Sequence, residues 1–302
     1  MTARILIIAG SDSGGGAGIQ ADIKTVTMLG GHAMTAVTAI TAQNTLGVTA
    51  VHPIPTDIVI AQMDAVLSDI GVDAVKIGMI GSAETANAVA DRLEGLDIPI
   101  VFDPVMVATS GSVLADDATI AAFERLMRIA SLVTPNIPEL EVLGGKDAVL
   151  AHGCHLLMKG GHAEGHIVKD DLWSPTALIR SLEGKKFETD DTHGTGCTLA
   201  SAIACRLGQG YAISDAFADG VRFVRIAIMM APGLGQGHGP IGHQDVRDFW
   251  EDDIPPPGPA LNQVTVSATD YAESITFYAT LGLRQIVDSP DNGYARFETA
   301  NG

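Results

Sequence analysis

The sequence predicts an α/β protein in which helices cover a mostly parallel β-sheet, followed by a short C-terminal α+β appendage. Two observations support this prediction. Short apolar runs alternate with segments whose apolar residues recur at helical spacing, which is the pattern of a parallel sheet covered by helices. Polar residues also stand at the ends of several apolar runs, where proteins with parallel sheets bind their ligands.

The first part of the chain supplies most of these elements. Apolar runs rich in β-branched residues predict strands at 5–10, 34–44, 73–81, 99–104, 131–136 and 155–161. Apolar residues at helical spacing predict helices at 19–29, 56–70, 83–94, 116–130 and 137–144. Because parallel strands end at the same edge of a sheet, we expect the residues at those ends to share one site: Asp12, Gln43, Met79, Asp103, Asn136 and Lys159.

The pattern changes near residue 165. Three short strands, expected to be antiparallel, are predicted at 166–173, 176–182 and 185–191, and helices at 198–208 and 213–231. A glycine-rich loop follows at 237–243, so a first domain is expected to span 1–250. The stretch EDDIPPPGPA, residues 251–260, predicts a linker, since three consecutive prolines cannot continue a helix. A separate segment would then occupy 261–302.

Composition excludes several classes of protein. The chain has 302 residues, 46% hydrophobic and 18% charged, which is enough for one large core and an appendage. The formal net charge of −18 disfavours nucleic acid and anionic membranes as partners, because phosphate contacts need clustered Lys and Arg. A nucleotide stays compatible, since a few N–H groups, one Lys and Mg²⁺ are enough to bind it. No apolar run is long enough to cross a membrane, and we expect a cytoplasmic protein.

The most informative motif is THGTGC, residues 192–197. Its glycines let the backbone approach a ligand closely, and the N–H groups of Gly194, Thr195, Gly196 and Cys197 would open the next helix. Such amides and the helix dipole make an anion site that suits a transferring phosphoryl group. An ordinary tight turn at a helix start is the alternative interpretation.

Cys197 stands at the N-terminus of that helix, where the helix dipole is expected to lower the pKa of its thiol. It can act as a base, as a polarizable group over a substrate hydroxyl, or only as a small capping residue. A thiol protease with His193 as partner is disfavoured, because His193 is only four residues away and no orienting Asn or Asp is implied. Cys154 and Cys205 are expected in the core, and three sparse cysteines without CxxC predict neither a disulfide framework nor a zinc site.

Strand-end residues suit a nucleotide with its metal. Asn136 and Glu139, three apart, face one side of a helical turn and can hold Mg²⁺ directly or through waters. Asp103 can do the same from the neighbouring strand, and Lys159 can meet a phosphate as a point charge. Each signal is weak alone, because carboxylates at strand ends are common. The histidines near glycines are expected to be loop residues: His162, His166, His238 and His243.

Eight stretches between residue 4 and about residue 245 occur in an order typical of one enzyme family: IAGSDSGGGAGIQADIKT, TAITAQNTLGV, KIGMIGS, FDPVMVATSG, LVTPNIPEL, LMKGGH, DTHGTGCTLASAIA and GHGPIGH. In these stretches the chain resembles the bacterial hydroxymethylpyrimidine/phosphomethylpyrimidine kinases of thiamine biosynthesis, within the ribokinase-like superfamily. The resemblance implies a three-layer α/β/α fold with a small β-element over the site, and a homodimer. It also implies transfer of the γ-phosphate of MgATP to 4-amino-5-hydroxymethyl-2-methylpyrimidine and then to its monophosphate.

The resemblance also implies roles for individual residues. It places these residues around the pyrimidine: Gly10, Asp22, Gln43, Met79 and Val105. The Gln43 amide suits an aminopyrimidine edge because it both donates and accepts. Asp103 and Glu139 match positions tied to Mg²⁺ and phosphate, and the nucleotide side receives Lys159, Thr195 and Asn136.

Residues 194–197 match the family's anion hole. At the position of Cys197, most ribokinase-like kinases carry an Asp that acts as the catalytic base. We expect Cys197 to be a positioning residue and weak base, not a covalent nucleophile, because a largely dissociative phosphoryl transfer needs little base strength.

Two segments depart from the family. Residues 140–161 are shorter than usual by roughly one helix, which implies that a covering helix is trimmed or missing. Residues 261–302 instead resemble the first half of a glyoxalase/vicinal-oxygen-chelate module, with Gln263 and Glu298 near its metal-ligand positions. This segment is a truncated remnant, or a half-module that pairs with a second chain.

Three other functions stay open. The chain can be a pyridoxal kinase of the same superfamily, or an inactive kinase fold that binds or regulates. The tail can also act as a metal-dependent lyase or a resistance-type binding module.

Overall fold

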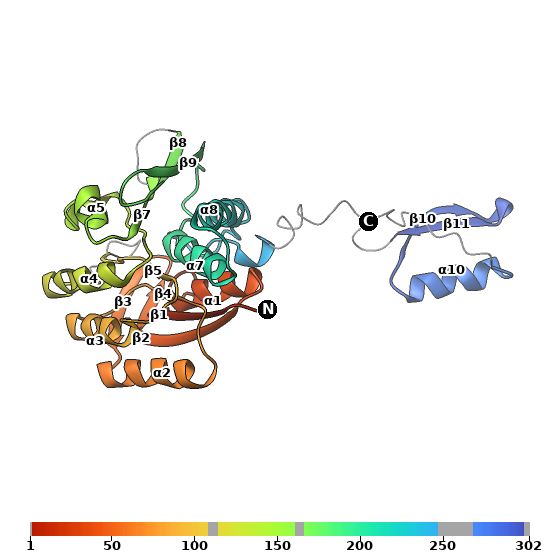
Figure 1. Cartoon of the computed structure of the whole chain (residues 1–302). Helices are drawn as coiled ribbons and strands as arrows, with labels where there is room; N and C mark the ends of the chain where they lie inside the picture. The colour runs from red at the N-terminus through yellow and green to blue at the C-terminus, as the bar shows by residue number, and fades with distance from the viewer. Residues whose placement is uncertain (1, 108–113, 161–165, 247–267, 299–302) are drawn as a thin grey trace. The chain divides into compact units, whose positions relative to one another are not determined.

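The computed structural model describes residues 2–107, 114–160, 166–246 and 268–298. Two compact units make up the chain, Met1–Asp252 and Asp253–Gly302. The larger unit has a sheet in the order β3-β2-β1-β4-β5-β6-β7-β8-β9 (Figure 1). The strands are β1 (Arg4–Asp12), β2 (His32–Asn44), β3 (Gly47–Pro53), β4 (Ala74–Ile77), β5 (Ile100–Phe102), β6 (Leu132–Val133), β7 (His155–Met158), β8 (Ile167–Trp173) and β9 (Leu178–Lys185).

The strand order creates a place for a ligand. β1 pairs in parallel with β2 on one side and with β4 on the other, so the chain crosses from one half of the sheet to the other beside β1. The parallel pairs continue through β5, β6 and β7, whereas β3, β8 and β9 pair antiparallel at the two edges. Sheets of this kind bind ligands beyond the carboxyl ends of the strands near such a crossing.

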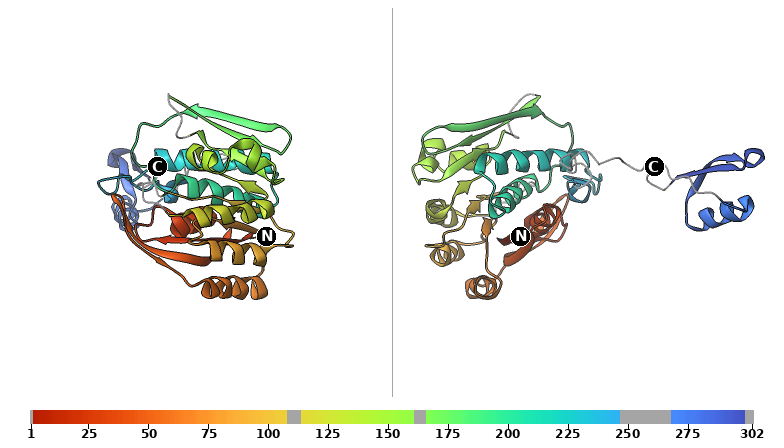
Figure 2. Two further views of the ribbon diagram at one scale, coloured as in Figure 1. Left: turned by 90° about the vertical axis from the view of Figure 1, so that its left-hand side faces the viewer. Right: turned by 45° about the vertical axis from the view of Figure 1, so that its right-hand side comes forward.

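Helices cover both faces of the sheet, so the expected α/β fold is confirmed (Figure 2). One face carries α2 (Thr56–Asp69), α3 (Ala83–Leu93) and α4 (Asp117–Ile129), followed by the short helices α5 (Ile137–Val142) and α6 (Lys146–Leu150). The other carries α1 (Gly18–Met28), α7 (Thr195–Gly208) and α8 (Ile213–Met229), and the 3-10 turn η2 (His243–Asp245) follows them. Among the described residues, no helix is long and apolar enough to span a bilayer.

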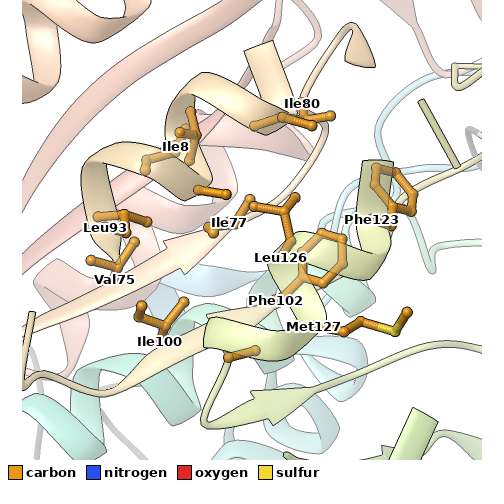
Figure 3. Close-up of a cluster of buried hydrophobic side chains, with 14 of the residues drawn as sticks. Ile8, Val75, Ile77, Ile80, Leu93, Ile100, Phe102, Phe123, Leu126 and Met127 are labelled. Carbon is orange, nitrogen blue, oxygen red and sulfur yellow. The ribbon is translucent and has the colours of Figure 1, made fainter. Parts of the chain in front are cut away.

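Alternation along the strands divides the core into two layers. On β1, Leu6 and Ile8 belong to the layer under α2–α4, whereas Ile5 and Ile7 belong to the layer under α1, α7 and α8. Strands buried on both faces read as continuous apolar runs, which is why they could be recognised in the sequence. In the first layer the rings of Phe102 and Phe123 meet edge to face, with centroids 5.1 Å apart (Figure 3).

The sequence prediction differs from the structure at two places. The strand β3 is not predicted, because most of its side chains are exposed at the sheet edge and it lacks an apolar run. The strand expected at 185–191 is wrong, since β9 ends at Lys185 and residues 186–191 form no regular element. The segment expected to have a trimmed or missing covering helix contains the five-residue helix α6, whose Val149 is fully buried.

The smaller unit consists of α10 (Tyr271–Thr280), the 3-10 turn η4 (Pro290–Asn292), and the antiparallel strands β10 (Arg284–Ser289) and β11 (Tyr294–Glu298). None of the α10 side chains is buried. The linker expected at 251–260 and Gln263 lie outside the described residues, as does the side chain of Glu298. The glyoxalase-like metal site therefore stays a prediction.

The two-layer core predicts a large cost for truncating Leu126, which is fully buried on α4. Leu126→Ala should lower the free energy of unfolding by about 2–5 kcal/mol, because it loses apolar burial and leaves a cavity. Leu96→Ala, at a side chain 40% exposed, should change it by no more than about 0.5 kcal/mol. Urea unfolding followed by circular dichroism measures both, and equal losses would contradict the layer assignment.

Candidate active site

A cavity with a volume of about 970 Å³ lies at the carboxyl ends of the central strands of the larger unit. Its walls come from segments far apart in sequence, including the loop after β1 and the start of α7. These expected site residues line it: Gly10, Asp12, Gln43, Met79, Asp103, Val105, Asn136, Glu139, Lys159, Gly194, Thr195, Gly196 and Cys197. The structure thus brings together every predicted site residue except Asp22.

The N-terminus of α7 supplies backbone donors to the cavity. The helix starts after Gly194, whose φ of +87° is a conformation that favours glycine. The amide of Thr198 bonds to the carbonyl oxygen of Gly194 at 2.9 Å. The amides of Gly196 and Cys197 precede that bond and therefore have no partner within the helix. This arrangement fits the predicted anion site at the positive end of a helix of 14 residues.

The loop after β1 presses against this helix start. A Cβ atom at Gly194 would lie 1.9 Å from the carbonyl oxygen of Gly16, and a Cβ at Gly16 would lie 2.5 Å from His193 Cδ2. Asp12 gives the loop its shape, because its carboxylate accepts hydrogen bonds from the amides of Gly14 (2.8 Å), Gly16 (3.0 Å) and Ala17 (2.8 Å).

Asp12 also contacts His193, whose Nε2 lies 2.9 Å from Asp12 Oδ2. Burial acts to raise the pKa of Asp12, but the hydrogen bonds from His193 and from the amides of Ala17 and Gly14 outweigh it, so the pKa is lowered. Asp12 is therefore ionised at neutral pH.

Opposite charges meet at the phosphate end of the cavity. Lys159 Nζ donates to Asp103 Oδ1 at 2.9 Å, and Thr134 Oγ1 donates to the same oxygen at 2.9 Å. A Cβ atom at Gly196 would lie 3.3 Å from Lys159 Nζ, so the ammonium group reaches the start of α7. Burial acts to lower the pKa of Lys159, but the charges of Asp103 and Glu139 outweigh it and the pKa is raised.

Asn136 and Glu139 form a capping box at the start of α5. The Asn136 side chain accepts from the Glu139 amide at 2.9 Å, and Glu139 Oε2 accepts from the Asn136 amide at 2.8 Å. Burial, followed by the charge of Asp103, raises the pKa of Glu139 against the opposing effect of Lys159. Among the described residues, no three His, Cys, Asp or Glu side chains group as ligands for a metal.

The expectation of a lowered thiol pKa at Cys197 is wrong. Burial raises the pKa to about 11, and the nearby charges of Asp22 and Asp103 act in the same direction. Lys76 and the amide of Gly18 offset only part of this effect. Position at a helix start was the only factor visible in the sequence, and desolvation overrides it. Cys197 is therefore a neutral thiol at physiological pH.

Asp22 is the expected site residue that does not line the cavity. It is fully buried, and its two oxygens accept from Lys76 Nζ (2.8 Å) and Ser201 Oγ (2.7 Å). Its partner Lys76 is also fully buried and does line the cavity. Sequence reasoning missed Lys76, although one signal was present, namely a single lysine inside the apolar strand β4.

Sequence reasoning gave His193 no role in the cavity and placed His243 in a loop. His193 is 7% exposed and lines the cavity beside Asp12. His243, expected in a loop, is 1% exposed, and its Nε2 lies 2.8 Å from Thr198 Oγ1 on α7. Burial lowers the pKa of His243 to about 4. Flanking glycines mark a loop in sequence but do not report how deeply its side chains are buried.

Known proteins resemble the larger unit. The family model for phosphomethylpyrimidine kinase matches residues 12–242. The hydroxymethylpyrimidine/phosphomethylpyrimidine kinase of Rhizobium meliloti is 45% identical over 269 residues, which is 83% of this chain and 100% of that protein. A thiamine biosynthesis bifunctional protein of Geobacter sulfurreducens is 46% identical and covers 81% of this chain and 54% of that protein.

Solved structures agree with this similarity. The phosphomethylpyrimidine kinase of Clostridium difficile 630 is 38% identical with a TM-score of 0.65, covering 75% of this chain and 100% of that one. A pyridoxal kinase of Bacillus subtilis in an ADP complex is 31% identical with a TM-score of 0.75, covering 82% and 99%.

The buried Lys76–Asp22 pair predicts a further stability effect. Lys76→Met leaves the Asp22 charge buried without its cation, and should lower the free energy of unfolding by about 3–5 kcal/mol. The double variant Lys76→Met/Asp22→Asn should recover much of that loss. Arg128→Met, which breaks the exposed pair with Glu124, should cost less than about 1 kcal/mol. Denaturant titrations measure the free energy of unfolding of each variant. If Lys76→Met lowers it no more than Arg128→Met does, the prediction is refuted.

Proposed function

The chain belongs to the phosphomethylpyrimidine kinase family, and we propose that the cavity at the start of α7 is the active site of its kinase reaction. The chain is an ATP-dependent kinase that phosphorylates hydroxymethylpyrimidine and then the resulting monophosphate in thiamine biosynthesis. The observation that carries the site proposal is the convergence of the α7 amides, Lys159 and two carboxylates on one cavity.

The two ends of the cavity suit two parts of the reaction. At one end Gln43 offers an amide, and Gly10, Met79 and Val105 line the wall around it, which suits a flat aminopyrimidine. At the other end the amides of Gly196 and Cys197 face the cavity together with Lys159, which suits phosphate oxygens. We assign the first end to the pyrimidine, and the second to the transferred phosphoryl group and the nucleotide, where Thr195 and Asn136 also line the wall.

Asp103 and Glu139 are the proposed Mg²⁺ residues. The donor set fits, because Mg²⁺ prefers one or two carboxylates completed by waters and substrate phosphates. Both carboxylates line the cavity, and burial, followed by the charge of Asp103, raises the pKa of Glu139. A bound Mg²⁺ would neutralise charge on the phosphate oxygens. Lys159 already pairs with Asp103 and would hold that carboxylate in place.

Cys197 has a role that a neutral thiol can perform. Its raised pKa excludes a standing thiolate, so we assign it the position of a weak donor and acceptor beside the substrate hydroxyl. A loose phosphoryl transfer requires little proton abstraction before the bond to phosphorus forms. Alignment of the hydroxyl with the helix amides is therefore the larger contribution we expect from this residue.

The alternatives are less well supported. Similar pyridoxal kinases share 31% identity with this chain, below the 38% of the solved pyrimidine kinase. An inactive kinase fold was suggested only by the shortened segment, which still contains α5 and α6. The expected homodimer and cytoplasmic location remain part of the proposal, as does the division into domains at 1–250 and 261–302.

The function predicts ATP consumption by the purified full chain with hydroxymethylpyrimidine and with its monophosphate. Turnover should require Mg²⁺ and should exceed that with pyridoxal by at least about tenfold in kcat/KM, because Gln43 matches the aminopyrimidine edge. A coupled assay for ADP measures all three substrates. Turnover of pyridoxal alone would overturn the substrate assignment, and none with any substrate in a folded sample would favour a binding protein.

Cys197→Ala tests the positioning role. The variant should lower kcat by about 10–100-fold while the dissociation constant of hydroxymethylpyrimidine changes less than about threefold, since alignment matters mainly in the transition state. Cys205→Ala, at a buried cysteine of the same helix that does not line the cavity, serves as the control. Equal losses of binding and turnover at Cys197 would show that the thiol mainly shapes the pocket.

A further inference from the structure

A row of polar side chains connects the loop after β1 to the pyrimidine end of the cavity. His193 Nε2 lies 2.9 Å from Asp12 Oδ2 and 3.1 Å from the Gln43 amide atom assigned as Nε2. The amide atom assigned as Oε1 lies 3.2 Å from Thr41 Oγ1, which also lies 3.0 Å from the carbonyl oxygen of Ser11 and can donate to it. These side chains line the cavity, and the kinase reaction as described above uses only Gln43.

The first step is to locate the proton between Asp12 and His193. Asp12 accepts three backbone amides, and this arrangement stabilises the ionised carboxylate. A carboxylate cannot donate, so the hydrogen in the 2.9 Å contact must be on His193 Nε2. The single N–H of His193 Nε2 is directed at Asp12, so Nε2 has no lone pair with which to accept a hydrogen bond from Gln43 and can only share its hydrogen with an acceptor there.

This donor fixes the orientation of the Gln43 amide. The two ends of an amide are distinguished by their hydrogen bonds, and an NH₂ group facing His193 Nε2–H at 3.1 Å would place two donors together. The assignment of the two amide atoms must therefore be exchanged, so that Oε1 faces His193 and Nε2 faces Thr41. Thr41 Oγ1 is already the donor to Ser11, so its lone pair accepts from the amide nitrogen. With this orientation no two donors in the row face each other, and the second N–H of Gln43 stays available to the substrate.

We propose that the Asp12–His193 pair determines specificity by fixing the order of donor and acceptor that Gln43 presents to the substrate. Asp12 and His193 are positioning residues, because they act through Gln43. The inference deepens the proposed function and rests on it, since it assigns Gln43 to the substrate edge.

The order of donor and acceptor distinguishes two chemical classes of substrate. A 4-aminopyrimidine presents a ring nitrogen that accepts and an amino group that donates. Its 4-oxo analogue in the N–H form exchanges the two roles, because the ring nitrogen donates and the oxygen accepts. An amide that rotates freely can pair with the edge of either substrate. A fixed amide pairs with only one of them, and with the other substrate a donor faces a donor. A hydrogen-bonding site discriminates against the substrate that leaves its buried polar groups unpaired.

The test compares kcat/KM for hydroxymethylpyrimidine and its 4-oxo analogue. The wild-type chain should prefer the amino substrate by at least about 100-fold. In His193→Ala the amide is released, and this preference should fall by at least about tenfold, mainly through improved use of the oxo analogue. A preference that stays the same in the variant would overturn the inference.

His243→Ala is the matched control, because His243 is a buried histidine that bonds to α7 without lining the cavity. Damage to the helix should lower turnover of both substrates and leave the ratio unchanged. A wild-type chain that phosphorylates neither substrate would refute the proposed function. A chain with amino-substrate turnover but an unchanged ratio in His193→Ala would refute this inference alone.

Neutron diffraction of the unliganded full chain gives an answer that does not depend on a folded variant. Deuterium should appear on His193 Nε2, and the ND₂ group of Gln43 should face Thr41. Deuterium on the Gln43 atom nearest His193 would overturn the inference.

Discussion

Two stretches of backbone meet at the active site with no space for a side chain between them. The carbonyl oxygen of Gly16 would lie 1.9 Å from a Cβ atom at residue 194, and Gly194 also has a φ of +87°. This contact sets the start of α7 against the loop after β1. The position of the helix amides, of His193 and of Cys197 all follow from it. A side chain at either glycine would separate the phosphate end of the cavity from the pyrimidine end.

Buried charge controls the chemistry behind that contact. Lys76 and Asp22 are fully buried, and Asp103 and Lys159 form a second pair toward the phosphate end. Each charge has an opposite partner, which is the condition under which ions are tolerated away from water. Burial raises the pKa of the Cys197 thiol, and the carboxylates of Asp22 and Asp103 act in the same direction, so the thiol stays neutral beside these pairs. A neutral group at this position leaves the positive groups available to phosphate oxygens.

Sequence reasoning recovered the sheet because most of its strands are buried on both faces and read as apolar runs. It also placed the strand-end residues correctly, since the carboxyl ends of parallel strands share one edge. It missed β3, whose exposed side chains carry no apolar pattern, and the roles of Lys76 and His193, whose partners are far away in sequence. Asp22 was assigned to the cavity from a family motif, yet it lies outside the cavity wall and forms a buried ion pair with Lys76. Contacts of this kind depend on tertiary packing, which spacing along the chain does not encode.

The bond between Asp12 and His193 joins residues 181 positions apart. Synthesis at about 5–20 residues per second separates their emergence by roughly ten to forty seconds. During that interval the first loop has its aspartate and glycines but lacks the histidine and the helix that they hold. The growing chain can pair its early strands, but half of its substrate site has not yet been made. Catalytic competence is thus acquired late in translation, after most of the parallel sheet has been synthesised.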